Sequence, residues 1–265
     1  MIMHGADDFL DAVKRAAEAG MAANREIVVR CGKHGEFTRG DLNSRDMRDD
    51  ECPECYAERR AEADRDRRLR EALRHFEQHS GVPLRFQPAS FENYIPPTEQ
   101  AEAILATLKS YTANFEKYRA KGLSLILCGT TGTGKTHLAC AVLKGIASEH
   151  GISGLYDTAY KAIQKVRATY RSHEESEQQA VERYIAPALL VLDEIGVQYG
   201  TDSEKLILFS ILNGRYEEMK PSLLVSNLTV DEIIDYLGDR VFDRMRENGG
   251  AVLAFNWTSH RQRRS

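Results

Sequence analysis

The chain has no uninterrupted apolar run approaching the ~18 residues that a membrane-spanning helix needs, and it begins without the pattern of a secretory signal peptide. Its net charge is only −4 at pH 7, so no overall positive field attracts nucleic acid. Its five cysteines are an odd number, and disulfides are not expected. These absences predict a cytoplasmic protein with no membrane partner, in which any nucleic-acid contact comes from a local patch.

A glycine-rich loop stands out in LSLILCGTTGTGKTHLAC, residues 123–140. An apolar segment precedes the loop and helical spacing follows it, which is the context that a P-loop (G-x-x-x-x-G-K-[ST]) requires. Backbone N–H groups of such a loop surround phosphate oxygens, and the helix N-terminus adds its positive dipole. The loop predicts a nucleoside triphosphate site formed by Gly129, Thr130, Thr131, Gly132, Thr133, Gly134, Lys135, Thr136 and His137. Lys135 is expected to reach the β- and γ-phosphates, and Thr136 to ligate Mg²⁺.

An acidic pair ends a second apolar segment, ALLVLDEIG at residues 188–196. Asp193 falls at the carboxyl end of this predicted strand, where open α/β sheets bind ligands, and is the second candidate ligand of Mg²⁺. Glu194 is a candidate to orient or deprotonate an attacking water, which a hydrolase needs. Asn227, in PSLLVSNLT at residues 221–229, either contacts the γ-phosphate or caps the next helix, and the residue taken alone favours the cap.

Predicted strands alternate with helical segments in the C-terminal part of the chain. This alternation predicts an α/β fold with a parallel sheet that is covered on both faces. A helix is expected over about residues 98–120, and Cys128 and Cys140 are interpreted as buried apolar residues. The five strands are expected near residues 123–128, 154–158, 189–193, 223–226 and 252–255.

The remaining three cysteines lie early in the chain, together with a histidine. Cys31 and His34 form one C-x-x-[CH] pair and Cys52 and Cys55 another, which is typical of a tetrahedral Zn²⁺ site with three thiolates and one imidazole. The segment between the pairs is too polar to form its own core, so a metal would supply the folding energy that this unit lacks. The alternative is that these are unrelated reduced cysteines.

Two regions are expected, residues 1–80 and residues 81–265. The first begins with a short amphipathic helix over residues 1–20, contains the zinc-binding segment and ends in a charged helix over residues 56–80. Charges of both signs in that helix indicate a solvated connecting helix rather than an arm for nucleic acid. Glycine and prolines in GVPLRFQPASFENYIPP then interrupt helical structure and mark the boundary.

These motifs, in this order, resemble AAA+ ATPases, and more closely the replicative helicase loaders of the DnaC/DnaI type from bacteria and phages. The CGKHGEF and CPEC segments are similar to the zinc-binding N-terminal parts of some phage-borne members. The resemblance covers most of residues 81–261 and is carried by GVPLRF, SFENY, GTTGTGKTHLA, LLVLDEIGVQ, LLVSNLT, LGDRVFDRMRENGG and FNWTSHR.

The resemblance implies an ATPase that binds ATP, Mg²⁺ and single-stranded DNA and associates with its own copies in an AAA+ arc. It implies that the N-terminal part docks on a hexameric DnaB-type helicase, which the protein loads onto DNA. Carried over residue by residue, Lys135 and Thr136 are Walker A, Asp193 and Glu194 Walker B, Asn227 sensor 1 and Arg261 sensor 2. Arg244 is the arginine finger, with Arg240 as the second choice.

The DNA-contacting segment that the resemblance implies contains aromatic residues with basic neighbours, a mixture that suits single-stranded nucleic acid. An ordinary amphipathic helix accounts for these residues equally well. They are Tyr156, Tyr160, Lys161, Lys165, Arg167, Tyr170 and Arg171. Two other functions share the P-loop: a transposition helper of the IstB type, and a small-molecule kinase, for which the sequence indicates neither a lid nor an acceptor pocket.

Overall fold

The computed structural model describes residues 28–38, 51–171, 175–197 and 201–259, in two units that comprise residues 1–66 and 67–265. The helix expected over residues 1–20 and Arg261, the predicted sensor 2 residue, lie outside the described residues. None of the described helices combines the length and apolar character that crossing a membrane requires.

The first unit contains a β-hairpin and the beginning of a long helix. Strand β1 (Val28–Cys31) pairs antiparallel with β2 (Gly35–Thr38), and Gly35 adopts a φ of +88° where the chain reverses. Helix α2 (Pro53–His79) begins with proline, whose fixed φ and missing N–H suit the first helical position. The helix continues into the second unit, where Ala72 and Phe76 are buried in the core.

The second unit is built on a five-stranded parallel sheet in the order β4-β5-β6-β3-β7. The predicted α/β class and the parallel sheet are therefore confirmed. Strand β6 lies between the P-loop strand β3 and the acidic strand β5, so the chain inserts one strand between its two nucleotide motifs. The strands are β3 (Leu125–Gly129), β4 (Leu155–Thr158), β5 (Leu190–Ile195), β6 (Ser222–Ser226) and β7 (Ala251–Phe255).

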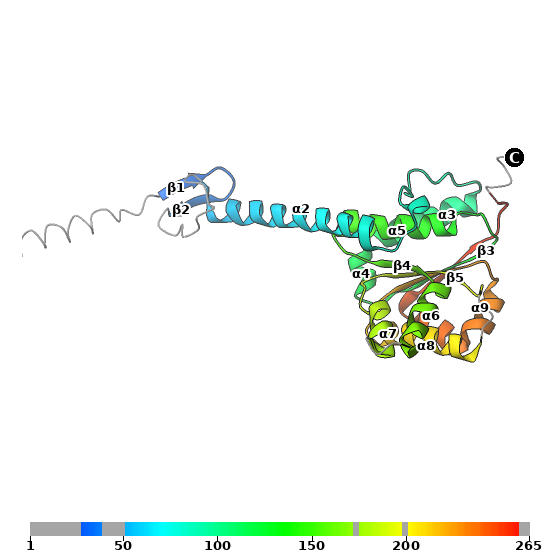
Figure 1. The fold of residues 1–265 in the computed structure, drawn as a ribbon. Coiled ribbons are helices and arrows are strands. Elements are labelled where there is room, and N and C mark those ends of the chain that lie inside the picture. Colours follow the sequence, from blue (N-terminus) through cyan, green and yellow to red (C-terminus); the bar gives the residue numbers. More distant parts are fainter. Residues whose placement is uncertain (1–27, 39–50, 172–174, 198–200, 260–265) are drawn as a thin grey trace, which may run out of the picture. The chain divides into compact units, whose positions relative to one another are not determined.

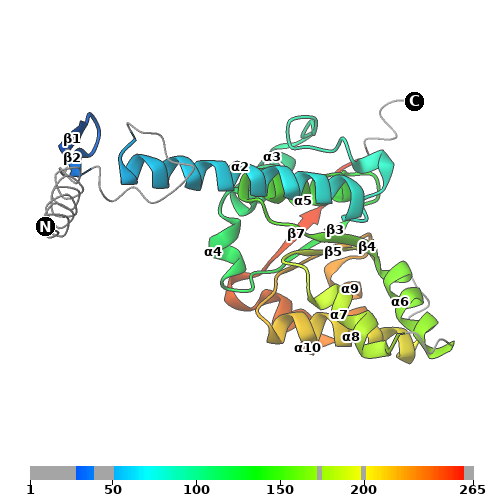
Figure 2. The same cartoon turned by 60° about the vertical axis from the view of Figure 1, so that its left-hand side comes forward.

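Helices cover both faces of this sheet (Figures 1 and 2). Residues of β3 alternate between the two faces: Leu125 and Leu127 pack under α5, whereas Ile126 and Cys128 pack against α6 and α8. Both Cys128 and Cys140 are buried, as predicted. One face carries α3 (Glu99–Ala113) and α5 (Lys135–His150), and the other α6 (Ala159–Ala168), α7 (Glu177–Ile185), α8 (Asp202–Glu217), α9 (Val230–Leu237) and α10 (Asp239–Arg246).

Short helices and one break complete the unit. The helix expected over residues 98–120 is divided at Asn114, whose φ of −106° and ψ of 22° are not helical, so a separate helix α4 (Phe115–Arg119) follows. The Asn114 side chain donates to the carbonyl of Ser110, and such local bonds compete with the helix. Short 3₁₀ turns are η2 (Leu84–Phe86), η3 (Thr169–Arg171) and η4 (Glu247–Gly249).

A fully buried arginine joins the ends of several elements on the α8 face. Arg215 donates to the hydroxyl of Ser222 and to the carbonyls of Tyr184, Ile185, Pro187 and Pro221. Burial lowers the pKa of Arg215 to about 9. Because carbonyl oxygens accept so many of its N–H groups, this cation stays hydrogen-bonded in the core and closes the C-terminal end of α7.

Candidate nucleotide site and candidate metal centre

The glycine-rich loop connects β3 to α5 at the carboxyl edge of the sheet. Gly132 and Gly134 have φ values of +78° and +97°, a region that residues with a side chain rarely adopt. A Cβ on Gly134 would also lie 2.5 Å from Cε2 of Tyr94, whose hydroxyl donates to the carbonyl of Thr133 at 3.1 Å. The loop conformation therefore requires glycine at position 134. Helix α5 begins directly after this residue, so its first N–H groups lie at the loop.

Lys135, the first residue of α5, is buried within the loop. Its Nζ donates to the carbonyl oxygens of Gly129 at 2.8 Å and Thr130 at 2.7 Å. Burial lowers the pKa of Lys135 to about 8, although the nearby Asp193 acts in the opposite direction. The two carbonyls thus hold the ammonium group at the loop where the P-loop motif requires a positive charge.

The carboxylate of Asp193 connects three segments. Its Oδ2 accepts hydrogen bonds from the hydroxyls of Thr136 and Tyr156, each at 2.8 Å, and its Oδ1 accepts the N–H of Glu194 at 2.7 Å. Because Thr136 directs its proton at Asp193, the lone pairs of the same hydroxyl are available to a cation. A hydroxyl and a carboxylate in contact are the oxygen ligands that Mg²⁺ prefers, so the residues present fit this ion.

Glu194 and Asn227 lie beside this pair at the ends of neighbouring strands. Glu194 is exposed and has a φ of +59°, which is unusual for a residue other than glycine, and the β5–β6 register shifts between Leu192 and Ile195. Asn227 follows β6 and is exposed. The interpretation of Asn227 as a helix cap is wrong: Thr229 caps α9 and forms a capping box with Glu232.

One cavity of about 450 Å³ brings these residues together. Lys135, Thr136, Asp193, Glu194 and Asn227 all line it, and so do His137 and the loop residues Thr131, Gly132, Thr133 and Gly134. The sequence motifs do not predict the remaining lining of the cavity, which includes residues 85–86, 93–95 and 97 together with Trp257 and Thr258. Aromatic residues in the proline-rich segment and in FNWTSHR are the sequence signal for this part of the lining, but no motif links them to the P-loop.

Arg244 lies apart from this cavity, whose lining in the described part of the chain does not include it. The guanidinium donates to the side-chain oxygen of Asn213 and lies 4.7 Å from the ring centre of Tyr216, both on α8. Arg240, the second choice for an arginine finger, is exposed on α10. Within one chain, the structure therefore leaves Arg244 on the α8 side, away from the nucleotide cavity.

Among the residues predicted to contact DNA, some are buried or paired within the chain, and others are accessible to solvent. Tyr156 is only 4% exposed, so its assignment as a base-stacking residue is wrong. Lys165 pairs with Asp157 at 2.6 Å. Tyr160 and Tyr170 remain accessible, at 54% and 56% exposure, because α6 and η3 turn them away from the core.

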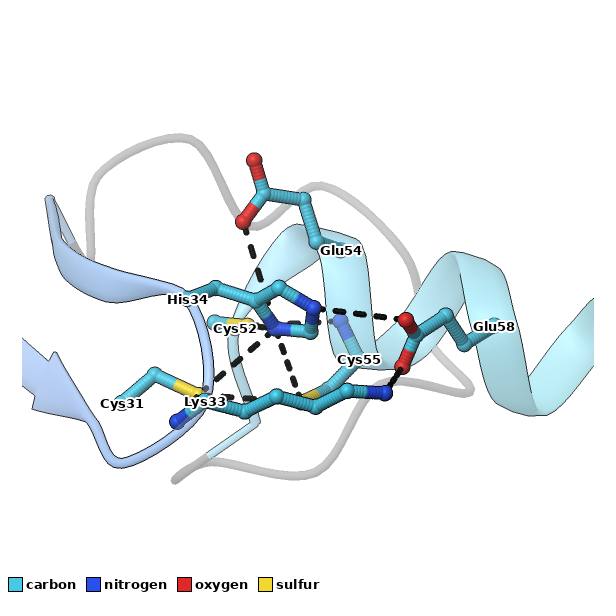
Figure 3. Close-up of polar contacts among 7 residues, drawn as sticks. All are labelled: Cys31, Lys33, His34, Cys52, Glu54, Cys55 and Glu58. Carbon is cyan, nitrogen blue, oxygen red and sulfur yellow. Dashed lines mark hydrogen bonds and ion pairs between the residues drawn. The ribbon is translucent and has the colours of Figure 1, made fainter.

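The four predicted zinc ligands converge in the first unit (Figure 3). Their ligand atoms all lie within 4.8 Å of one another. Sγ of Cys31 is 3.7 Å from Sγ of Cys55, and Nδ1 of His34 is 3.3 Å from the sulfur atoms of both Cys52 and Cys55. Zn–S bonds of ~2.3 Å and Zn–N bonds of ~2.0 Å separate tetrahedral ligands by roughly 3.4–3.8 Å. The cluster therefore fits a Zn²⁺ ion.

A second layer of contacts surrounds these ligands. Nε2 of His34 lies 3.3 Å from Oε1 of Glu58, and the other carboxylate oxygen of Glu58 accepts from Nζ of Lys33 at 2.5 Å (Figure 3). A carboxylate on Nε2 would fix the imidazole so that the Nδ1 lone pair could bind a metal ion. The backbone N–H of Lys33 lowers the pKa of Cys31 to about 6, which favours the thiolate that binds metal.

Comparison with known proteins identifies the family. Residues 60–263 match the family described as IstB-like ATP binding protein. The replicative helicase loader DnaC of Escherichia coli (strain K12) is 34% identical over 205 residues, which cover 77% of this chain and 82% of that protein. The family match begins after Cys55, so the candidate metal centre lies outside it.

Solved structures agree with the fold of the second unit. The crystal structure of the DnaC helicase loader superposes with a TM-score of 0.60 at 23% identity, covering 65% of this chain and 99% of the other. The crystal structure of DnaI gives a TM-score of 0.55 at 19% identity, covering 65% and 93%. The protein therefore belongs to the IstB-like ATP-binding family, as a relative of the DnaC-type replicative helicase loaders.

Proposed function

We propose that this protein is an ATP-dependent loader that places a DnaB-type replicative helicase on single-stranded DNA in the cytoplasm. The observation that carries the proposal is the convergence of Lys135, Thr136, Asp193, Glu194 and Asn227 on one cavity. That cavity occurs in a chain whose 34% identical relative is named a replicative helicase loader. Residues 1–80 are proposed to dock on the helicase, and residues 81–265 to bind ATP and DNA.

The proposed reaction is hydrolysis of ATP to ADP and phosphate. Lys135 neutralises charge on the β- and γ-phosphates, while Thr136 and Asp193 hold Mg²⁺, which supplies further positive charge to the phosphates when bound. Glu194 accepts a proton from the attacking water or orients it. Asn227, at the end of β6, contacts the γ-phosphate or that water. The presence or absence of the γ-phosphate therefore changes the contacts at the end of β6.

Single-stranded DNA is proposed to contact α6 and the turn that follows it. Tyr160 and Tyr170 present accessible rings there, and Lys161 is exposed between them in the sequence. Aromatic faces stack on bases and lysine binds the backbone, without sequence preference. This surface is smaller than the one the sequence predicted, because Tyr156 is buried.

A transposition helper of the IstB type is the second candidate, because the matched family carries that description. The loader is preferred because the DnaC of Escherichia coli (strain K12) matches over 82% of its own length. A pull-down separates the two: a loader retains the replicative helicase, whereas a transposition helper retains a transposase.

We also propose that Cys31, His34, Cys52 and Cys55 bind one Zn²⁺ per chain. The ion would join the hairpin to the start of α2, because each contributes two ligands. The described hairpin has short strands and exposed side chains such as Val28, so it buries little apolar surface of its own. Metal coordination supplies the missing stabilisation.

Lys135→Ala should weaken ATP binding roughly 10–100-fold, since it removes a charged hydrogen-bond donor to phosphate. It should leave the helicase contact intact, because that contact is assigned to residues 1–80. Fluorescence titration with a labelled ATP analogue and helicase pull-down measure the two effects. Lys117→Ala, on an exposed position of α4, is the matched control. A folded Lys135→Ala protein that no longer retains the helicase would contradict this division of roles.

Arg244→Ala should abolish the stimulation of ATPase turnover by assembly, because Arg244 is proposed to complete a neighbouring chain's site. A loss of roughly tenfold or more is expected, although an arginine supplied in trans is worth ~10³–10⁵ in other P-loop enzymes. Nucleotide affinity should persist, and mixing Arg244→Ala with Glu194→Gln chains should restore some turnover. Arg246→Ala is the control, since Arg246 is exposed on the same helix. Turnover per chain that stays constant on dilution of wild type would exclude the trans arrangement.

Protein purified without added metal should contain about one zinc per chain by elemental analysis. Cys52→Ser should lose most of this zinc, because Cys52 is a buried member of the cluster. Cys140→Ala removes a buried thiol outside the cluster and should retain it. Folded wild-type protein that is free of zinc would overturn the metal proposal.

A further inference from the structure

We propose that Tyr156 is a positioning residue that holds Asp193 in the orientation needed for Mg²⁺. The proposal rests on the ATP site proposed above and adds to it a residue from outside the nucleotide motifs. The hydrogen bond from the Tyr156 hydroxyl to Oδ2 of Asp193, at 2.8 Å, is the main support for this proposal.

The position of Tyr156 follows from the sheet. Strand β4 is the parallel neighbour of β5, and Thr158 pairs with Asp193 while Tyr156 pairs with Val191. Tyr156 packs in the core cluster under α5 and is only 4% exposed. The ring is therefore held by packing, and its hydroxyl reaches the carboxylate of the neighbouring strand.

The two hydroxyls on Oδ2 have different tasks. Thr136 belongs to the P-loop helix and offers its lone pairs to the cation, whereas Tyr156 belongs to the sheet and its hydroxyl donates to the carboxylate. Burial and the neighbouring Asp193 raise the pKa of Tyr156, so its hydroxyl keeps the proton that it donates. With the N–H of Glu194 on Oδ1, these bonds leave the carboxylate little freedom to rotate.

A carboxylate that is fixed before the cation arrives loses less rotational freedom on binding it. Removing a hydrogen-bond partner of a metal-binding group typically costs 10–100-fold in metal affinity or activity. Tyr156 should therefore act on the Mg²⁺-dependent part of nucleotide binding. It should leave the part that Lys135 and the loop N–H groups provide without metal.

The chain contains a matched control for this bond. Tyr184 donates to Oδ2 of Asp157 at 2.9 Å and is 2% exposed, on the other face of the sheet. Loss of either hydroxyl removes a buried tyrosine–aspartate hydrogen bond. Only the Tyr156 bond reaches a residue that lines the nucleotide cavity.

The experiment compares Tyr156→Phe, Tyr184→Phe and wild type in the full-length protein. The affinity for a fluorescent ATP analogue is measured over a series of Mg²⁺ concentrations and in excess EDTA, after circular dichroism has verified folding. For Tyr156→Phe we expect the Mg²⁺ concentration at half-maximal binding to rise roughly 10–100-fold, with unchanged affinity in EDTA. For Tyr184→Phe we expect neither change.

An equal Mg²⁺ response in the two tyrosine variants would overturn the proposal, as would an equal loss with and without Mg²⁺. A second comparison uses Asp193→Asn: adding Tyr156→Phe to it should shift the Mg²⁺ response no further, because the carboxylate is already gone. An additive shift would contradict the proposed route through Asp193. Wild type that binds no ATP analogue would refute the proposed function itself, which distinguishes that failure from failure of the Tyr156 assignment.

Discussion

The nucleotide site depends on one buried carboxylate at the end of β5. Asp193 accepts hydrogen bonds from the hydroxyl of Thr136 in the P-loop helix and from the hydroxyl of Tyr156 in β4. It also accepts the backbone N–H of Glu194, the next residue in its own strand. These donors meet only if β4 and β5 pair in register and if α5 begins where the glycine loop ends. A slip of one residue in β5 would turn the carboxylate to the other face of the sheet.

The strand order brings Asn227 beside both nucleotide motifs. Because β6 lies between β3 and β5, Asn227 is placed between the phosphate loop and the acidic pair. The positive φ of Glu194 and the shifted register beside it place backbone strain at the proposed catalytic base. A change at the phosphates would thus reach the exposed residues Glu194 and Asn227 at the ends of two strands.

Much of this site could be predicted from the sequence because its signals are local. The glycine spacing identifies Lys135 and Thr136, the acid after an apolar strand identifies Asp193, and the paired C-x-x-[CH] spacing selects the four residues that converge. The sequence could not predict the structural roles of Tyr156, Trp257 and the buried Arg215. These roles depend on which distant segments of the chain pack against each residue. Asn114 divides a helix through one side-chain bond that periodicity does not reveal.

We have proposed that ATP bound at Asp193 and Lys135 drives helicase loading, and the candidate metal centre lies outside the family match. The most direct measurement is unwinding of a forked duplex by the replicative helicase of the same cell, when the single strand is coated with single-strand binding protein. With ATP present throughout, we expect unwinding only when this protein is added. Equal unwinding with and without this protein would contradict it.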